Sequence, residues 1–194
     1  MKDITANEMA FVLKILKSPE TEYNATSIAK VLNMSAMGAL KIAKRLEKEG
    51  IIKGIKKGKA TFYSLNLKEE YARQYLKFLL QREAAQAKVY LRVWVRELRK
   101  IEHAYAIILF GSVLHKEKEA RDIDAVIVVD QDNFGTIKKE IKDVNIVNIK
   151  KVHPIFQTRD DLKNNIKKPD RVILNALKGI VVKGEDVILE SLFQ

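Results

Sequence analysis

The sequence predicts an α+β fold with two folded parts and a long helical connector. Residues 1–67 have the pattern of three short amphipathic helices and two strands, residues 68–102 contain neither Gly nor Pro, and residues 103–194 alternate apolar strands with helical segments. A chain of 194 residues, 47% hydrophobic and 31% charged, is typical of globular proteins and is long enough for two small domains. We therefore expect domains at 1–67 and 103–194, joined by a connector at 68–102.

Three short polar side chains mark helix starts in the N-terminal part. Asn7, Asn24 and Ser35 are each expected to cap a helix, because such side chains accept hydrogen bonds from free backbone N–H groups. The third helix ends at Gly50. One of its faces is apolar at helical spacing and is formed by Ala39, Ile42, Ala43 and Leu46. The other face is expected to be exposed and carries Met37, Lys41, Lys44, Arg45 and Lys48.

A predicted β-hairpin with a cationic tip follows these helices. Its strands are expected at 51–56 and 60–65, and its tip is Lys56-Lys57-Gly58-Lys59. Residues 5–67 resemble the winged-helix DNA-binding domains of small repressors. The resemblance implies that the third helix enters the major groove of double-stranded DNA and that the hairpin, the wing, contacts the adjacent backbone or minor groove.

The resemblance implies a DNA-binding set of Lys41, Lys44, Arg45, Lys56, Lys57 and Lys59. Arg45 is the candidate for reading a guanine edge, because its guanidinium can donate two hydrogen bonds to that base. Two alternatives stay open: the cations form a solvated helix face, or the winged helix binds protein.

Charge is distributed unevenly along the chain. The net charge is +11, and residues 1–102 carry 15 Lys and 6 Arg against 11 acidic residues, or +10 of it. A strongly basic half beside a nearly neutral half indicates that the first half contacts a polyanion.

The connector carries more apolar surface than a free linker needs. Leu91, Trp94, Leu98 and Ile101 share one helical face. We expect this surface to pack on one of the domains or on a second copy of the chain, which would make a homodimer; packing within one chain is the alternative. Trp94 is expected to lie in a core.

Two neighbouring strands of the C-terminal part carry the residues that indicate chemistry. Gly111-Ser112 follows a strand expected at 103–110, and Asp122-Ile123-Asp124 opens the next strand after nine intervening residues. Carboxylates two residues apart on a strand point to the same face. Ionised carboxylates on a buried strand need a partner, and a divalent cation satisfies both at the lowest cost in free energy. The glycine allows backbone N–H groups and the serine hydroxyl to approach a phosphate.

This pattern resembles the polymerase-β-like nucleotidyltransferase superfamily in its minimal form, over about residues 103–190. The resemblance implies a small mixed sheet, Mg²⁺ held by the catalytic residues Asp122 and Asp124, and the phosphates of ATP or another nucleoside triphosphate on Gly111 and Ser112. It also implies transfer of a nucleotidyl group to an acceptor. Residues 153–184 are similar to the tail of archaeal members. Small members include antitoxin partners of toxins, which implies a protein acceptor such as a toxin.

The expected third strand departs from the family pattern. After a helix from Asn133 to about Lys142, a strand is expected at 144–152, and it contains no carboxylate. Asp143, just before it, is the remaining candidate for a third metal ligand, and Asn145 or Asn148 are neutral alternatives. His103, His115 and His153 are scattered and show no metal-binding spacing.

These departures leave two further interpretations open. The C-terminal domain can be a catalytically inactive nucleotide sensor or partner-binding module on a winged-helix transcription factor. Alternatively, the chain is an enzyme whose winged helix recruits a nucleic-acid or protein substrate.

The composition also predicts the compartment. The sequence contains no Cys, no apolar segment long enough for a membrane span, and no apolar segment after Met1-Lys2-Asp3. We therefore expect a cytoplasmic protein without a membrane partner.

Overall fold

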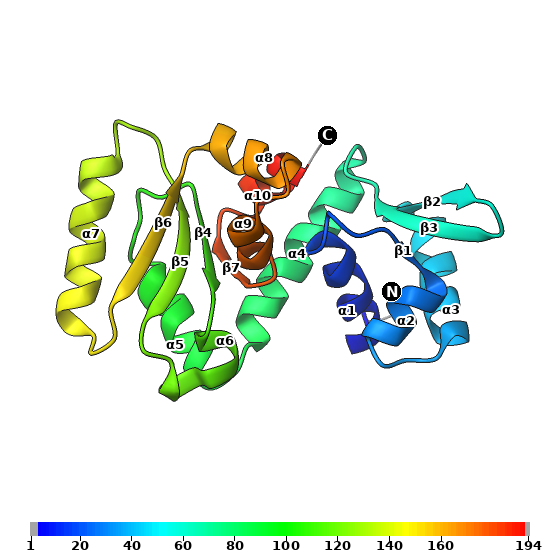
Figure 1. The fold of residues 1–194 in the computed structure, drawn as a ribbon, viewed down its shortest axis with the longest axis horizontal. Helices are drawn as coiled ribbons and strands as arrows, with labels where there is room; N and C mark the ends of the chain where they lie inside the picture. Colours follow the sequence, from blue (N-terminus) through cyan, green and yellow to red (C-terminus); the bar gives the residue numbers. More distant parts are fainter. Residues whose placement is uncertain (1–3, 193–194) are drawn as a thin grey trace. The chain divides into compact units, whose positions relative to one another are not determined.

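The computed structural model describes residues 4–192, and the chain divides into two compact units between Leu79 and Leu80. Figure 1 shows the elements of both units. Each unit is described by itself below.

The first unit is a winged helix. Its elements are α1 (Ala6–Leu16), β1 (Tyr23–Asn24), α2 (Ala25–Val31), α3 (Ala36–Lys48), β2 (Ile52–Lys57), β3 (Ala60–Leu65) and the first part of α4 (Glu70–Gln86). The three strands pair antiparallel in the order β1-β3-β2. The predicted three helices and cationic hairpin are therefore confirmed.

Helix caps were predicted well with one exception. Asn24 and Ser35 accept hydrogen bonds from the third residues of α2 and α3, as predicted. The prediction for Asn7 was wrong, because Thr5 caps α1 and the Glu8 side chain bonds back to the Thr5 backbone N–H. This reciprocal capping box satisfies two free donors at once, whereas Asn7 lies inside the helix.

The core of the first unit lies under the hairpin. Phe11, Ile28 and Leu46 are completely buried, one from each helix. The ring of Phe11 meets that of Tyr63 on β3 edge to face, with centroids 6.1 Å apart. Because α3 also contacts β2, the third helix and the wing belong to the same packed unit.

The second unit is built on a four-stranded mixed sheet. Its elements are the rest of α4, α5 (Val89–Leu98), β4 (Ala106–Phe110), α6 (Val113–Lys116), a 3₁₀ turn η1 (Glu117–Glu119), β5 (Ile123–Val128), α7 (Phe134–Val147), β6 (Val152–Gln157), α8 (Arg159–Lys167), α9 (Arg171–Leu177), β7 (Ile180–Lys183) and α10 (Glu185–Leu192). The strand order is β6-β5-β4-β7, with β6 parallel to β5 and the other pairs antiparallel. The small mixed sheet is thus confirmed.

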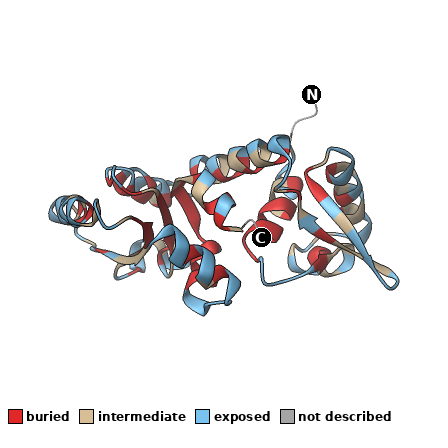
Figure 2. Ribbon diagram, turned by 90° about the horizontal axis from the view of Figure 1, so that it is seen from above, coloured by how far each residue is buried: buried red, intermediate tan, exposed pale blue. Residues whose placement is uncertain are grey.

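Both faces of this sheet are covered. Residues 107, 109, 123, 125 and 127 face a core shared with α5 and α7, in which Trp94 is 4% exposed, as predicted. Helices α8, α9 and α10 contact β4, β5 or β6 and contribute further buried apolar residues. Alternation along a strand therefore puts residues 122, 124 and 126 on the face opposite α5 and α7. Figure 2 shows that the strands are largely buried.

Two predicted elements differ from the structure. The connector is two helices, since α4 ends at Gln86 and α5 begins at Val89. The strand predicted at 144–152 was wrong, because α7 continues to Val147 and β6 begins at Val152. Asn145 explains the join, since its side-chain oxygen accepts a hydrogen bond of 2.7 Å from the Val152 backbone N–H.

The true third strand was hard to find because it contains Pro154. Proline cannot donate a hydrogen bond and is tolerated on edge strands, and β6 lies at the edge of the sheet. The more apolar stretch before it resembles a buried strand, but Ile149 is 98% exposed and Ile146 and Val147 are also exposed.

Within residues 4–192, no helix combines the length and apolar character needed to cross a bilayer.

Candidate functional site

The two aspartates lie where β4 ends and β5 begins. Antiparallel pairing of these strands places Phe110 opposite Asp124, so the turn at Gly111 lies beside the first residues of β5. Asp122 and Asp124 point to the same face of the sheet, and both are partly exposed. The predicted meeting of the Gly-Ser turn with the carboxylate pair therefore occurs.

Gly111 forms a cradle for the Asp124 carboxylate. Its backbone φ angle is +83°, a value that residues other than glycine rarely adopt. A Cβ at this position would lie 2.1 Å from Asp124 Oδ2, which is inside contact distance. Glycine is thus required twice, by the turn and by the carboxylate.

The carboxylate pair is electrostatically crowded. Burial raises the pKa of the Asp124 carboxyl above its ordinary value, the negative charge of Asp122 raises it further, and His153 lowers it. Keeping Asp124 ionised therefore costs free energy that a bound cation would recover.

His153 is a site residue that sequence reasoning missed. It lies on β6 in parallel register with Asp124, and its Nδ1 is 3.4 Å from Asp122 Oδ2. It was missed because the third strand was predicted at 144–152, which ends before this residue. The available signal was the alternation of Val152, Pro154 and Phe156 around His153 and Ile155, which would have put His153 on the same face as the aspartates.

The other predicted third ligands lie elsewhere. Asp143 lies on the exposed side of α7, so its assignment to the start of a third strand was wrong. Asn145 binds the Val152 N–H. Asn148 donates to Val144 O and to a Glu97 carboxylate oxygen. Both amides connect α7 to its surroundings and are occupied by structural hydrogen bonds.

The segment between Gly111-Ser112 and the aspartate pair is held by hydrogen bonds from Lys150. Ser112 is exposed, and its side chain makes no capping hydrogen bond to the short helix α6. Lys150, in the segment between α7 and β6, donates to the backbone oxygens of Lys118 and Ala120. The serine hydroxyl is therefore presented to solvent on a supported loop.

The donor set fits a magnesium ion that brings its own oxygen ligands. In the part of the chain that is described, no three His, Asp or Glu side chains are arranged as a complete metal site. Mg²⁺ usually takes only one or two protein carboxylates and completes its shell with water and substrate phosphates. Asp122, Asp124 and the open Gly111-Ser112 turn meet that requirement.

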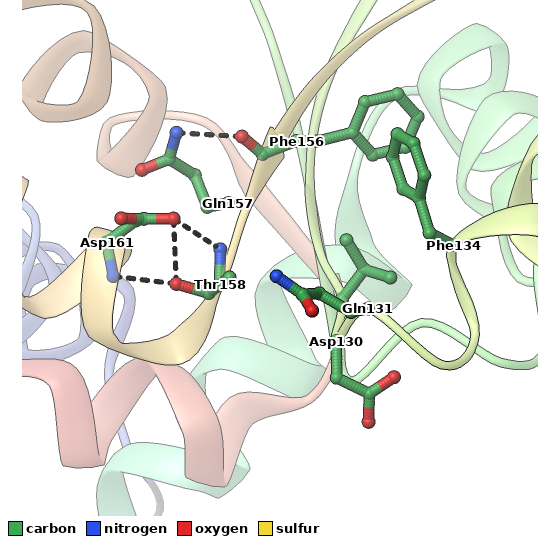
Figure 3. Close-up of a pocket in the computed structure, with 8 residues that line it drawn as sticks. Asp130, Gln131, Phe134, Phe156, Gln157, Thr158 and Asp161 are labelled. Carbon is green, nitrogen blue, oxygen red and sulfur yellow. Dashed lines mark hydrogen bonds between the residues drawn. The ribbon is translucent and has the colours of Figure 1, made fainter.

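A separate pocket lies at the other end of the parallel strands. Its volume is about 270 Å³, and Figure 3 shows its lining. Phe134 and Phe156 meet edge to face with centroids 4.8 Å apart, and Asp161 accepts hydrogen bonds from Thr158. These residues lie at or after the carboxyl ends of β5 and β6, whereas the aspartates lie at the start of β5.

The first unit presents a cationic surface on α3 and the wing. Lys41 and Lys44 are exposed, on one helical stripe with Met37. Lys56 and Lys59 are exposed on the wing. Lys57 is also exposed, but its Nζ is 2.5 Å from Glu22 Oε1, so it is paired at the surface.

Arg45 is held within its own unit. Its guanidinium forms ion pairs with Glu8 on α1 and, at 3.3 Å, with Glu49. Glu8 is buried and also completes the α1 capping box. Arg45 can therefore reach a base edge only by leaving a buried carboxylate without its cation, which is costly.

Comparison with known proteins bears on both units. Residues 91–182 match the family model described as a nucleotidyltransferase domain. No curated protein matches the chain. Among solved structures, the adhesin competence repressor AdcR from Streptococcus pyogenes matches with 22% identity and a TM-score of 0.37, over 50% of this chain and 68% of that one. So low a TM-score supports no conclusion, and the winged-helix assignment rests on the topology described above.

We predict that Gly111→Ala lowers the free energy of unfolding by about 2 kcal/mol, because an L-residue is strained at positive φ and its Cβ would collide with Asp124. Denaturation followed by Trp94 fluorescence measures this in the same unit. Gly135→Ala is the matched control, since nothing lies within 4 Å of its added Cβ and alanine favours α7. Equal effects of the two substitutions would contradict the cradle.

We predict that Arg45→Ala destabilises the first unit by about 2 kcal/mol, because the buried Glu8 carboxylate loses its charged hydrogen-bond partner. Chemical denaturation followed by circular dichroism measures the loss. Lys48→Ala, at an exposed position of the same helix, should change stability by less than about 0.5 kcal/mol. An Arg45→Ala protein as stable as the Lys48→Ala protein would show that the pair is not structural.

Proposed function

We propose that this chain, whose residues 91–182 match the family model of a nucleotidyltransferase domain, is a DNA-binding regulator that binds a nucleoside triphosphate with Mg²⁺ and transfers a nucleotidyl group to an acceptor. The observation that carries the proposal is the meeting of Gly111 with Asp124 beside Asp122. A cationic winged helix in the same chain supports the DNA-binding part.

Each site residue has a definite task in this proposal. Asp122 and Asp124 hold the cation, and Gly111 lets the turn come close enough for backbone N–H groups to reach phosphate oxygens. The exposed Ser112 hydroxyl donates to the same phosphates. When bound, the divalent cation neutralises triphosphate charge and orients the nucleotide.

The acceptor is proposed from the family resemblance alone. A hydroxyl group on a protein or small molecule would attack the α-phosphorus, and pyrophosphate would leave. A partner protein such as a toxin is the acceptor that the resemblance favours. A homodimer is proposed from the winged-helix resemblance, because a two-fold dimer matches a palindromic DNA site.

A second candidate function is nucleotide sensing without transfer. The observation favouring it is that β6 presents His153, and not a carboxylate, beside Asp124. In this case, incubation with α-labelled ATP and candidate acceptors would label none of them, although the nucleotide binds.

The DNA-binding surface is proposed to comprise Lys41 and Lys44 on α3 and Lys56 and Lys59 on the wing, all exposed. Lys57 joins them, because breaking a surface pair with Glu22 costs little. These contacts would position the protein on phosphates. Arg45 is assigned a structural role, which leaves sequence discrimination to other residues of α3.

We predict that Asp122→Asn/Asp124→Asn weakens Mg²⁺-dependent ATP binding at least tenfold, because both charged cation ligands are lost. Isothermal titration calorimetry, repeated with the other nucleoside triphosphates, measures it. The double variant should stay folded, since it relieves the repulsion between the carboxylates. If no nucleotide binds to the native chain, or the variant binds equally well, the nucleotide site is wrong.

We predict that Lys41→Ala/Lys44→Ala lowers the slope of log binding constant against log salt concentration by about two, because each lost phosphate contact removes nearly one released counterion. Fluorescence anisotropy with duplex DNA measures the slope. Lys139→Ala/Lys142→Ala, on exposed positions of α7, is the matched control with the same change in charge. An equal change in slope for both variants would refute the α3 interface.

A further inference from the structure

The pocket of about 270 Å³ lies at the carboxyl ends of the parallel strands β5 and β6. After β5 the chain enters α7, which packs in the core shared with α5, whereas after β6 it enters α8, which packs with α9 and α10. Figure 1 shows α7 and α8 on opposite sides of this strand pair. A crevice where the connections of two neighbouring parallel strands diverge in this way is a common position for small-ligand sites.

The deeper wall of this pocket is aromatic. Phe134 at the start of α7 and Phe156 on β6 meet edge to face, and Figure 3 shows their rings together, across the pocket from Thr158 and Asp161. The faces of aromatic rings carry negative potential and attract cations. Lys138 illustrates this attraction, since its Nζ lies 4.3 Å from the centroid of the Phe134 ring.

Two carboxylates complete the lining, and both are kept ionised. Asp130 accepts hydrogen bonds from the Tyr105 hydroxyl and the Asn133 N–H, and Asp161 accepts from the hydroxyl and the N–H of Thr158. These donors hold the pKa of both carboxyls below the ordinary value. Each carboxylate retains lone pairs for a further donor. The two also stand at the starts of α7 and α8, where a helix terminus would otherwise favour a phosphate.

The charge of the lining selects against anions. Among the described residues that line the pocket, none is Lys, Arg or His. Lys138 and Arg159 lie nearby, but each is stacked on a ring, that of Phe134 and that of Tyr105. A ligand that complements this lining has an apolar body, for the aromatic wall, and a positively charged donor, for the carboxylates.

We propose that this pocket is a second small-molecule site, which binds a small organic cation with an ammonium group on an apolar or aromatic body. The ammonium group donates to Asp130 and Asp161, and the body packs against Phe134 and Phe156. The volume lies just below the roughly 300–1,000 Å³ of most ligand pockets, so the ligand is small. The site goes beyond the proposed function, because residues 124 and 130 lie roughly 20 Å apart along β5.

Three probes of similar shape test the charge preference on the native full chain. Benzylamine, benzyl alcohol and benzoate carry the same ring with a positive, neutral or negative group, and the backbone amide NMR signals of Gln131 and Gln157 report their binding. Benzylamine should move these signals with a dissociation constant on the order of 1 mM, as expected of so small a ligand. Benzyl alcohol should bind at least about fivefold more weakly, because it lacks the charge-assisted hydrogen bonds, and benzoate should leave the signals unmoved.

Two pairs of substitutions test the residues. Asp130→Asn/Asp161→Asn removes both pocket charges but keeps a side-chain oxygen at each position, and it should weaken benzylamine binding at least about fivefold. Its effect on benzyl alcohol should stay within about twofold. Asp132→Asn/Asp160→Asn is the matched control, with the same change in charge at exposed neighbouring positions that do not line the pocket. It should leave the binding of benzylamine nearly unchanged, because exposed charges outside the pocket are screened.

Every outcome decides the proposal. A preference for benzylamine that is lost in the pocket variant and kept in the control supports the site. The absence of benzylamine binding, equal binding of the three probes, or an equal loss in both variants overturns it. The comparison of probes needs only the native chain, so it holds even if the pocket variant does not fold. Asp122→Asn/Asp124→Asn should bind benzylamine as the native chain does, which separates this site from the proposed nucleotide site.

Discussion

The antiparallel pairing of β4 with β5 is the interaction on which the second unit depends. It places Phe110 opposite Asp124, so a buried strand ends where the carboxylate-bearing strand begins. The alternate residues Ile123 and Ala125 then point into the core while Asp122 and Asp124 point to the other face. The strand register therefore decides which side chains enter the hydrophobic core and which face carries the carboxylates. A shift of one residue would turn the carboxylates into the core and the apolar side chains out of it.

The site is held against an electrostatic cost. Two like charges lie close together, one of them partly buried, and burial raises the pKa of Asp124. The cradle at Gly111 allows this crowding, because a larger residue would push the carboxylate away. A local loss of folding free energy of this kind is typical of functional sites, where ligand binding stabilises the charged groups.

Local signals in the sequence predicted much of the fold, and long-range partners account for what was missed. Asn24 and Ser35 cap helices because their side chains reach backbone groups three residues away, which a sequence displays directly. The ion pair of Arg45 with Glu8 joins helices far apart in the chain, so the arginine resembled a free DNA ligand. Its role depends on packing that no local pattern contains.

The missed strand shows the same limit for the site, and its place in the sheet explains why position 153 carries a polar side chain. Edge strand β6 tolerates Pro154, so its composition is unlike that of the buried β4 and β5. Val152 faces the core and is buried, whereas His153 is exposed on the opposite face. Core packing therefore constrains Val152, whereas the exposed position 153 beside the carboxylate pair can carry a polar side chain without creating a cavity. The edge strand is thus the place in this sheet where the residue beside the carboxylate pair can change at little cost in stability.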